Sequence, residues 1–160
     1  MNLGYDKTPL ILNLGCGKDI QDNWFNVDLR KVPGINLLYD LTKLPLPWKD
    51  NSVDGINAKD IVEHFIDVIS FIDECGRILK VGGSLRIRTT YWKTENSFTD
   101  PSHYHFFTLQ SFDYWDPATQ IGKEYGWYTK AKFKILSKDV DGQELEFVLQ
   151  KQNYLDSSED

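Results

Sequence analysis

The first candidate functional residues in the sequence are two glycines, Gly15 and Gly17, just after the apolar run of residues 10–14. A short apolar run closed by glycine is typical of a buried strand that enters a turn. Because glycine has no Cβ, this turn can adopt positive φ and let a ligand lie against bare backbone. Such turns after the first strand of an α/β sheet bind nucleotide-like cofactors. The GxG pattern alone is a weak signal, so the residues that follow it decide its interpretation.

Two aspartates follow at the ends of the next two apolar runs. Asp28 closes residues 24–28, where a carboxylate can accept hydrogen bonds from both hydroxyls of a ribose. Asp40 closes residues 35–40 and would flank an adenine placed beyond that ribose. Aspartates also form turns and cap helices, which is the better interpretation for either residue taken alone. The two together, behind the glycine pair, favour cofactor binding.

The histidines are the candidate proton acceptors. His64 follows Glu63, and His103 lies in an aromatic loop that starts at Asp100. A histidine that titrates near neutral pH can take a proton from a hydroxyl or an amine, so we name His103 and His64 as candidate catalytic residues. The alternatives are that His64 fixes the start of a helix and that His103 binds the loop backbone. A metal site of Asp100, His103 and His105 is disfavoured because one loop would supply every ligand without Cys or Glu, and we expect no metal.

Alternation of strands and crossovers must position these residues. The pattern predicts strands at residues 10–14, 24–28, 35–40, 53–58 and 84–89, and a helix over residues 61–80 that ends at Gly82 and Gly83. Residues 18–23 leave room for only a stub of the first crossover helix. Residues 90–127 are irregular, with one short helix expected from Thr108 to Pro117.

Two final strands, residues 132–138 and 144–150, are joined through a turn at Asp141 and Gly142. The predicted fold class is therefore α/β: a Rossmann-like three-layer sandwich whose mixed sheet is mostly parallel and carries a C-terminal antiparallel hairpin. Residues 1–153 are expected to form a single domain, and residues 154–160 a disordered acidic tail.

Composition restricts the partners and the compartment. The net charge of −6 argues against a nucleic-acid backbone as the main partner. Cys16 and Cys75 form neither a CxxC motif nor a disulfide framework, which is typical of a reducing compartment. The sequence shows no signal segment and no apolar run of membrane-spanning length. We therefore expect a cytoplasmic protein that does not associate with a membrane.

Several short motifs then occur in a characteristic order: residues 12–17, 26–28, 40–41, 44–45 with 51–54, 63–64 and 76–83. In this order they resemble the class I S-adenosylmethionine-dependent methyltransferases, specifically the small single-domain type. The resemblance covers about residues 10–90, and the terminal hairpin agrees with it. Asn13 stands where the family usually has an acidic residue, and a third glycine is missing.

The resemblance implies S-adenosyl-L-methionine as the cofactor. Gly15 and Gly17 would pass under its methionine and ribose, Asp28 would hold the ribose, and Asp40 would bond the adenine amino group. Leu29 and Leu41 would lie against the adenine, and Asn57 and Ala58 would face the transferred methyl. The full set of residues implied to contact the cofactor is Asn13, Gly15, Cys16, Gly17, Asp28, Leu29, Asp40, Leu41, Asn57 and Ala58.

The expected activity is methyl transfer to a small-molecule or glycan-type acceptor, held in a cleft lined by the aromatic residues of the segment 91–127. These rings can equally well cover a small core. A first alternative is a non-catalytic module that binds S-adenosylmethionine and acts with a partner protein or a second copy of itself. A second is a nicotinamide-dependent oxidoreductase, which the missing third glycine and the terminal hairpin disfavour.

Overall fold

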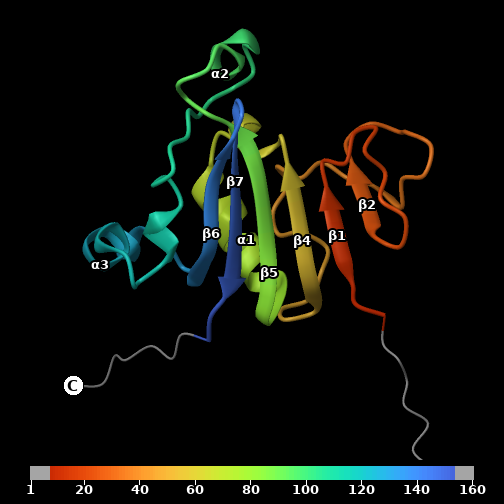
Figure 1. Cartoon of the computed structure of the whole chain (residues 1–160). Helices are drawn as coiled ribbons and strands as arrows, with labels where there is room; N and C mark the ends of the chain where they lie inside the picture. The colour runs from red at the N-terminus through yellow and green to blue at the C-terminus, as the bar shows by residue number, and fades with distance from the viewer. Residues whose placement is uncertain (1–7, 154–160) are drawn as a thin grey trace, which may run out of the picture.

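A computed structural model of the chain describes residues 8–153. Its seven strands form one sheet in the order β3-β2-β1-β4-β5-β7-β6 (Figure 1). Neighbours from β3 to β5 pair in parallel, whereas β7 is antiparallel to both β5 and β6, which confirms the predicted mixed sheet and its hairpin. The strands are β1 (Ile11–Leu14), β2 (Phe25–Asp28), β3 (Leu37–Leu38), β4 (Val53–Lys59), β5 (Leu79–Thr90), β6 (Phe133–Asp141) and β7 (Glu144–Lys151).

The core consists of apolar rows that cross four strands in register. One row runs through Leu12, Ile56, Leu85 and Leu149, and the next through Leu14, Ala58, Ile87 and Phe147, all buried. Because strand side chains alternate, both rows face the same side of the sheet. Helix α1 (Val68–Ile78) covers them with its own buried apolar residues, and Phe112 packs edge to face on Phe147.

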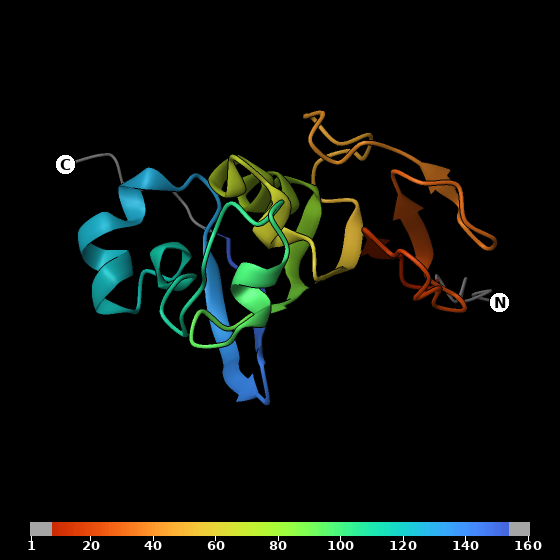
Figure 2. The ribbon, with the colours of Figure 1, turned by 90° about the horizontal axis from the view of Figure 1, so that it is seen from above.

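The opposite face of the sheet is polar. Asn13, Asn57 and Arg86 form a row across β1, β4 and β5 on this side. Residues 18–23 form only turns, and the connection from β2 to β4 holds no helix, so no helix of the described residues covers this face (Figure 2). The parallel strands therefore have helices on one face only, so the third layer of the predicted sandwich is missing from the described residues.

The predicted single helix over residues 61–80 is divided in two. Residues Val62–His64 form a 3₁₀ helix, η1, and α1 begins after Asp67, whose carboxylate accepts a hydrogen bond from Ser70 N at 2.9 Å. Such a cap satisfies a backbone donor that a continuous helix would bond internally. The predicted C-cap at Gly82 and Gly83 was wrong, because α1 ends at Ile78 and both glycines lie inside β5.

The helix predicted from Thr108 to Pro117 is reduced to a 3₁₀ helix of three residues, η2 (Asp113–Trp115). Residues 108–111 form a turn in which Thr108 N donates to Ser111 Oγ at 2.8 Å. Short helices flank this turn instead, namely α2 (Asn96–Thr99), η2 (Asp113–Trp115), α3 (Gln120–Tyr125) and η3 (Gly126–Tyr128). The strand predicted over residues 35–40 is reduced to the two residues of β3, so Asp40 lies beyond its end.

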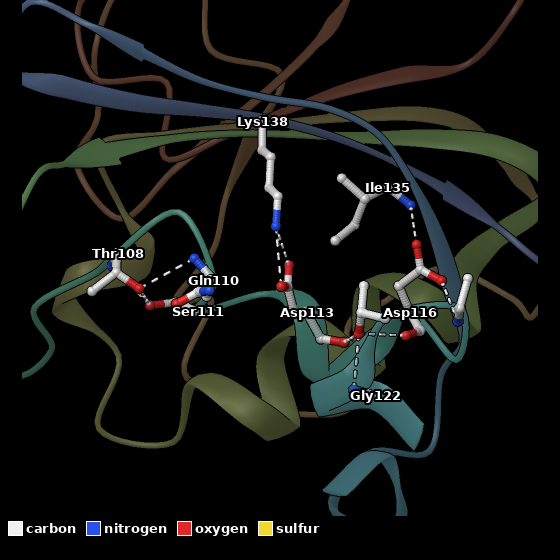
Figure 3. Close-up of polar contacts among 10 residues, drawn as sticks. Thr108, Gln110, Ser111, Asp113, Asp116, Gly122, Ile135 and Lys138 are labelled. Atoms are coloured by element: carbon white, nitrogen blue, oxygen red, sulfur yellow. Dashed lines mark hydrogen bonds and ion pairs between the residues drawn. The ribbon is translucent and has the colours of Figure 1, made fainter. Parts of the chain in front are cut away.

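Side chains of the η2–α3 segment fix it to β6 (Figure 3). Lys138 Nζ lies 2.7 Å from Asp113 Oδ1, and Ile135 N donates to Asp116 Oδ2 at 2.8 Å. The hydroxyl of Thr119 caps α3 by accepting from Gly122 N at 2.9 Å. These contacts hold the η2–α3 segment against β6.

Within residues 8–153, no helix combines the length and the apolar character that a bilayer crossing demands. The predicted acidic tail of residues 154–160 lies outside the described residues.

Glu74 on α1 anchors the loop between β3 and β4. It accepts hydrogen bonds from Leu46 N and from the guanidinium of Arg77, whose Nε lies 2.8 Å from Glu74 Oε2. Burial alone would raise the pKa of Glu74, but the bonds from Arg77 and Leu46 outweigh it and hold the pKa below its usual value. This ion pair therefore stabilises the fold only while the carboxyl is ionised.

We predict that Glu74→Gln lowers the free energy of unfolding by about 2 kcal/mol at pH 7, since it removes charged hydrogen bonds from a buried site. The lowered pKa makes this stabilisation complete above the unfolded-state pKa of about 4.3 and removes it as pH falls below that value. The difference in Tm between the wild type and the variant should then shrink below about pH 4. A difference that is constant from pH 7 to pH 3, or equal to that of the exposed Glu95→Gln control, contradicts this account.

Candidate functional site

A cavity of about 610 Å³ opens at the carboxyl ends of β1, β2 and β4. This is the edge at which parallel α/β sheets place their ligands. Its lining includes the following residues singled out from the sequence: Gly15, Gly17, Asp28, Leu29, Asp40, Leu41 and His64. A cavity of similar volume beside Arg77 and Lys151 contains none of them, so the residue types and not the volume identify the candidate site.

The two glycines adopt left-handed backbone conformations, with φ of +65° at Gly15 and +53° at Gly17. A Cβ at Gly15 would lie 2.2 Å from Cγ2 of Ile61, so the Ile61 side chain packs directly on bare backbone. Gly17 N donates to Asp28 Oδ2 at 2.7 Å. The loop therefore needs glycine for its conformation at both positions and for close packing at Gly15.

Asp28 ends β2 with only 6% of its surface exposed. Its Oδ2 accepts from Gly17 N, and its Oδ1 accepts from Arg30 N at 2.8 Å. An ionised carboxylate has about four acceptor positions, so lone pairs remain for hydroxyl donors. Asp28 thus fixes the glycine loop and can still hold a ribose.

Asp40 also lines the cavity and is half-buried. Two hydrogen bonds from Thr42, through the hydroxyl and the backbone N–H, lower the pKa of the Asp40 carboxyl. The group is therefore ionised at neutral pH and can accept from an amino group. Leu41 and Leu29 line the cavity beside it, and Leu29 is 66% exposed, which leaves an apolar surface on which a flat ring can lie.

The other residues implied by the resemblance do not line this cavity. Asn13 is buried and bonds Asn26 Oδ1 through its amide at 3.0 Å, while its own carbonyl accepts from Asn57 Nδ2 at 2.9 Å. Ala58 points into the apolar core. Cys16 is buried, and this burial raises the pKa of its thiol. Asn13 and Asn57 therefore link β1, β2 and β4 on the polar face of the sheet.

Sequence reasoning missed the residues that follow β4. The strand continues to Lys59, and it is Asp60 and Ile61, just beyond it, that line the cavity. Asp60 has a φ of +54°, which turns the chain back towards Gly15. The useful signal in the sequence was Ile61, which interrupts the strand pattern ahead of the Glu63–His64 pair.

The structure brings His64 and His103 together although they are far apart in the sequence. Their ring centroids are 4.8 Å apart, and Tyr104 N donates to Glu63 O at 2.8 Å, which fixes the loop to η1. His64 Nδ1 lies 3.0 Å from Ser102 Oγ. His105 is turned away and bonds Ile66 O through Nε2 at 3.1 Å.

Glu63 lies beneath the histidines and is 1% exposed. Thr89 Oγ1 donates to its Oε2 at 2.9 Å, and burial raises the pKa of the carboxyl. Asp100 accepts from Ser102 Oγ at 2.6 Å, and this bond lowers the pKa of Asp100. His64, Ser102 and Asp100 also line the cavity, whereas His103 does not.

The aromatic segment does not form one continuous cleft, contrary to expectation. Phe107 and Trp115 belong to the core, and Trp127 is 74% exposed and stacks on Tyr128 at the end of α3. Exposed rings near α2 include the stacked pair Phe98 and Phe106, with centroids 4.6 Å apart. Only this second group belongs to the loops that also carry His103.

Comparison with known families gives a match to the methyltransferase domain over residues 16–87. A comparison with curated proteins gives no match.

Solved structures share the fold at low identity. A chain of the Haloferax volcanii complex that contains the Trm112 methyltransferase activator is 14% identical, with a TM-score of 0.66 over 92% of this chain and 84% of that one. An S-adenosylmethionine-dependent methyltransferase from Archaeoglobus fulgidus is 13% identical, with a TM-score of 0.63 over 91% and 87%.

The 1,6-didemethyltoxoflavin-N1-methyltransferase of Burkholderia thailandensis, solved with its acceptor and S-adenosylhomocysteine, is 12% identical, with a TM-score of 0.60 over 91% and 72%. Residues 16–87 thus match the methyltransferase domain in sequence, and most of the chain shares its fold with S-adenosylmethionine-dependent methyltransferases of known structure.

Proposed function

We propose that this chain is an enzyme that transfers a methyl group from S-adenosyl-L-methionine to a small-molecule or glycan-type acceptor. The observation that carries the proposal is a single cavity that joins the glycine loop, Asp28, Asp40 and His64 at the carboxyl edge of the sheet. The methyltransferase-domain match supports it. So does the S-adenosylhomocysteine bound to the Burkholderia relative.

The cavity fits such a cofactor in shape and in chemistry. The space that a Cβ would fill at Gly17 is open except for Arg30, so a ligand chain can pass close to the backbone. Asp28 offers acceptors for two hydroxyls, and the ionised Asp40 offers an acceptor for an exocyclic amine. Leu29 and Leu41 supply apolar contact for the ring between them.

When bound, the cofactor supplies a methyl group already activated by a sulfonium. The protein must then align the acceptor behind that methyl and exclude water, and strong acid–base catalysis is not required. His64 lines this cavity, and His103 packs against His64 although it does not itself line the cavity. As candidate catalytic residues, these two histidines would accept a proton from the acceptor and orient the acceptor for transfer.

The net charge of −6 and the exposed rings near α2 favour a small or sugar-like acceptor over a nucleic acid.

A second candidate function is a non-catalytic module that binds the same cofactor and acts with a partner protein. The polar sheet face without helices favours it, because parallel sheets are usually covered on both faces. The Haloferax structure, in which a methyltransferase activator is bound, gives a precedent for the partner protein but not for a lack of catalysis. Turnover of any acceptor by the purified chain alone would exclude this candidate.

We predict that Asp28→Ala weakens binding of S-adenosylhomocysteine by at least about 30-fold, because two charge-assisted hydrogen bonds to the ribose are lost. Isothermal titration calorimetry measures the affinity. Asp28→Asn keeps the shape of the side chain and separates the role of charge, and the exposed Asp22→Ala is the matched control. Equal affinity of Asp28→Ala and wild type would refute the assignment of this cavity.

We predict that His103→Ala lowers kcat by about 100-fold or more while the affinity for S-adenosylhomocysteine stays within twofold of wild type. The reason is that His103 does not line the cavity that contains Asp28 and Asp40. His105→Ala, on the same loop, should retain full activity. An unchanged kcat for His103→Ala, or a parallel loss of cofactor affinity, would contradict this role.

A further inference from the structure

Three side chains with metal-binding atoms meet between η1 and the loop that follows α2. Glu63 and His64 come from η1 and His103 from the loop, and their ligand atoms all lie within 4.8 Å of one another. The sequence had suggested only a set confined to residues 100–105, which lacks a glutamate. The fold supplies a glutamate from a different segment. The observed cluster therefore contains Glu63 and His64 together with His103, and it does not contain Asp100 or His105.

The hydrogen bonds of the two histidines fix their tautomers. His103 Nδ1 lies 2.9 Å from the carbonyl oxygen of Ser97, which can only accept, so Nδ1 carries the hydrogen. Ser102 Oγ donates to Asp100, so it can accept the Nδ1–H of His64. Each ring therefore keeps the lone pair on Nε2. Metal-bound histidines are oriented in this way by carbonyl and carboxylate partners.

The three groups concentrate electron pairs in a small volume. No hydrogen bond among the described residues uses Nε2 of His64 or of His103. The side-chain hydrogen bond that Glu63 accepts comes from the uncharged hydroxyl of Thr89. Glu63 is also 1% exposed, and an ionised carboxylate is stable at such depth only when a positive charge or strong donors compensate it. A cation between the three side chains would supply that charge.

We propose that Glu63, His64 and His103 bind a divalent transition-metal ion, with Zn²⁺ as the first choice. Two imidazoles and a carboxylate are a donor set that zinc accepts, and three protein ligands leave a position open for water or substrate. Ligand atoms that lie about 2 Å from a tetrahedral zinc ion are about 3.4 Å apart. The present ligand atoms lie within 4.8 Å of one another, so side-chain rotations that move each atom by about 1 Å would complete the site. His64 also lines the cofactor cavity, and the open position can therefore face it.

The role of this ion rests on the proposed function, although its binding does not. An acceptor hydroxyl bound at the open position would lose its proton to water more readily. Its oxygen then takes the methyl carbon as the carbon–sulfur bond breaks, which leaves S-adenosylhomocysteine. The histidines would act on the acceptor through the ion.

The test is titration of the untagged, chelator-treated full chain with ZnCl₂ by calorimetry and with CoCl₂ by visible absorption. We expect one ion per chain and cobalt bands of a site with four or five ligands. Glu63→Gln, His64→Ala and His103→Ala should each weaken binding at least about 10-fold, whereas His105→Ala should leave it unchanged. Thermal melting of each variant verifies that it is folded, and Glu63→Gln preserves the shape of the buried side chain.

Absence of stoichiometric binding would overturn the proposal. Binding that survives all three substitutions, or that His105→Ala also removes, would overturn it as well. Titration with S-adenosylhomocysteine on the same samples separates the two proposals. Zinc binding without cofactor binding refutes the proposed function alone, and the reverse result refutes the metal site alone.

Discussion

The arrangement of the site depends on the missing Cβ of Gly15. Ile61 packs on the backbone of this residue so closely that any side chain there would overlap it. This contact fixes η1 beside the glycine loop, and with it Glu63 and His64. The loop that would hold the cofactor and the segment that would meet the acceptor are thereby placed in one cavity. Backbone packing, more than any hydrogen bond, sets the distance between them.

The two faces of the sheet have different roles. The apolar rows under α1 and Phe112 stabilise the fold, while Asn13 and Asn57 bond across the strands on the face without helices. Buried amides of this kind are stable because each polar group finds a partner. The shortened first crossover therefore costs the domain a helical layer but leaves the carboxyl edge of β1, β2 and β4 intact. The candidate site lies on this edge.

Sequence patterns predicted the part of the site whose residues lie close together in the sequence. Gly15, Gly17 and Asp28 lie close in sequence, and their strand–turn–strand pattern has a direct structural meaning. Strand alternation already puts Asn57 and Ala58 on opposite faces of the sheet, but the sequence could not show that the strand continues to Lys59 and that the chain turns at Asp60. Nor could it divide residues 61–80, because Ile61, Phe65 and Val68 keep helical spacing while Asp67 begins a new helix. The pairing of His64 with His103 depends on a loop folding back onto η1, which no periodicity encodes.

A crystal structure of the chain with S-adenosylhomocysteine tests the central claim most directly. The account predicts that both ribose hydroxyls lie within about 3 Å of the Asp28 carboxylate, with the adenine between Leu29 and Leu41. The sulfur should point towards His64. A ligand bound in the cavity beside Arg77 and Lys151, or one whose ribose lies away from Asp28, would contradict it.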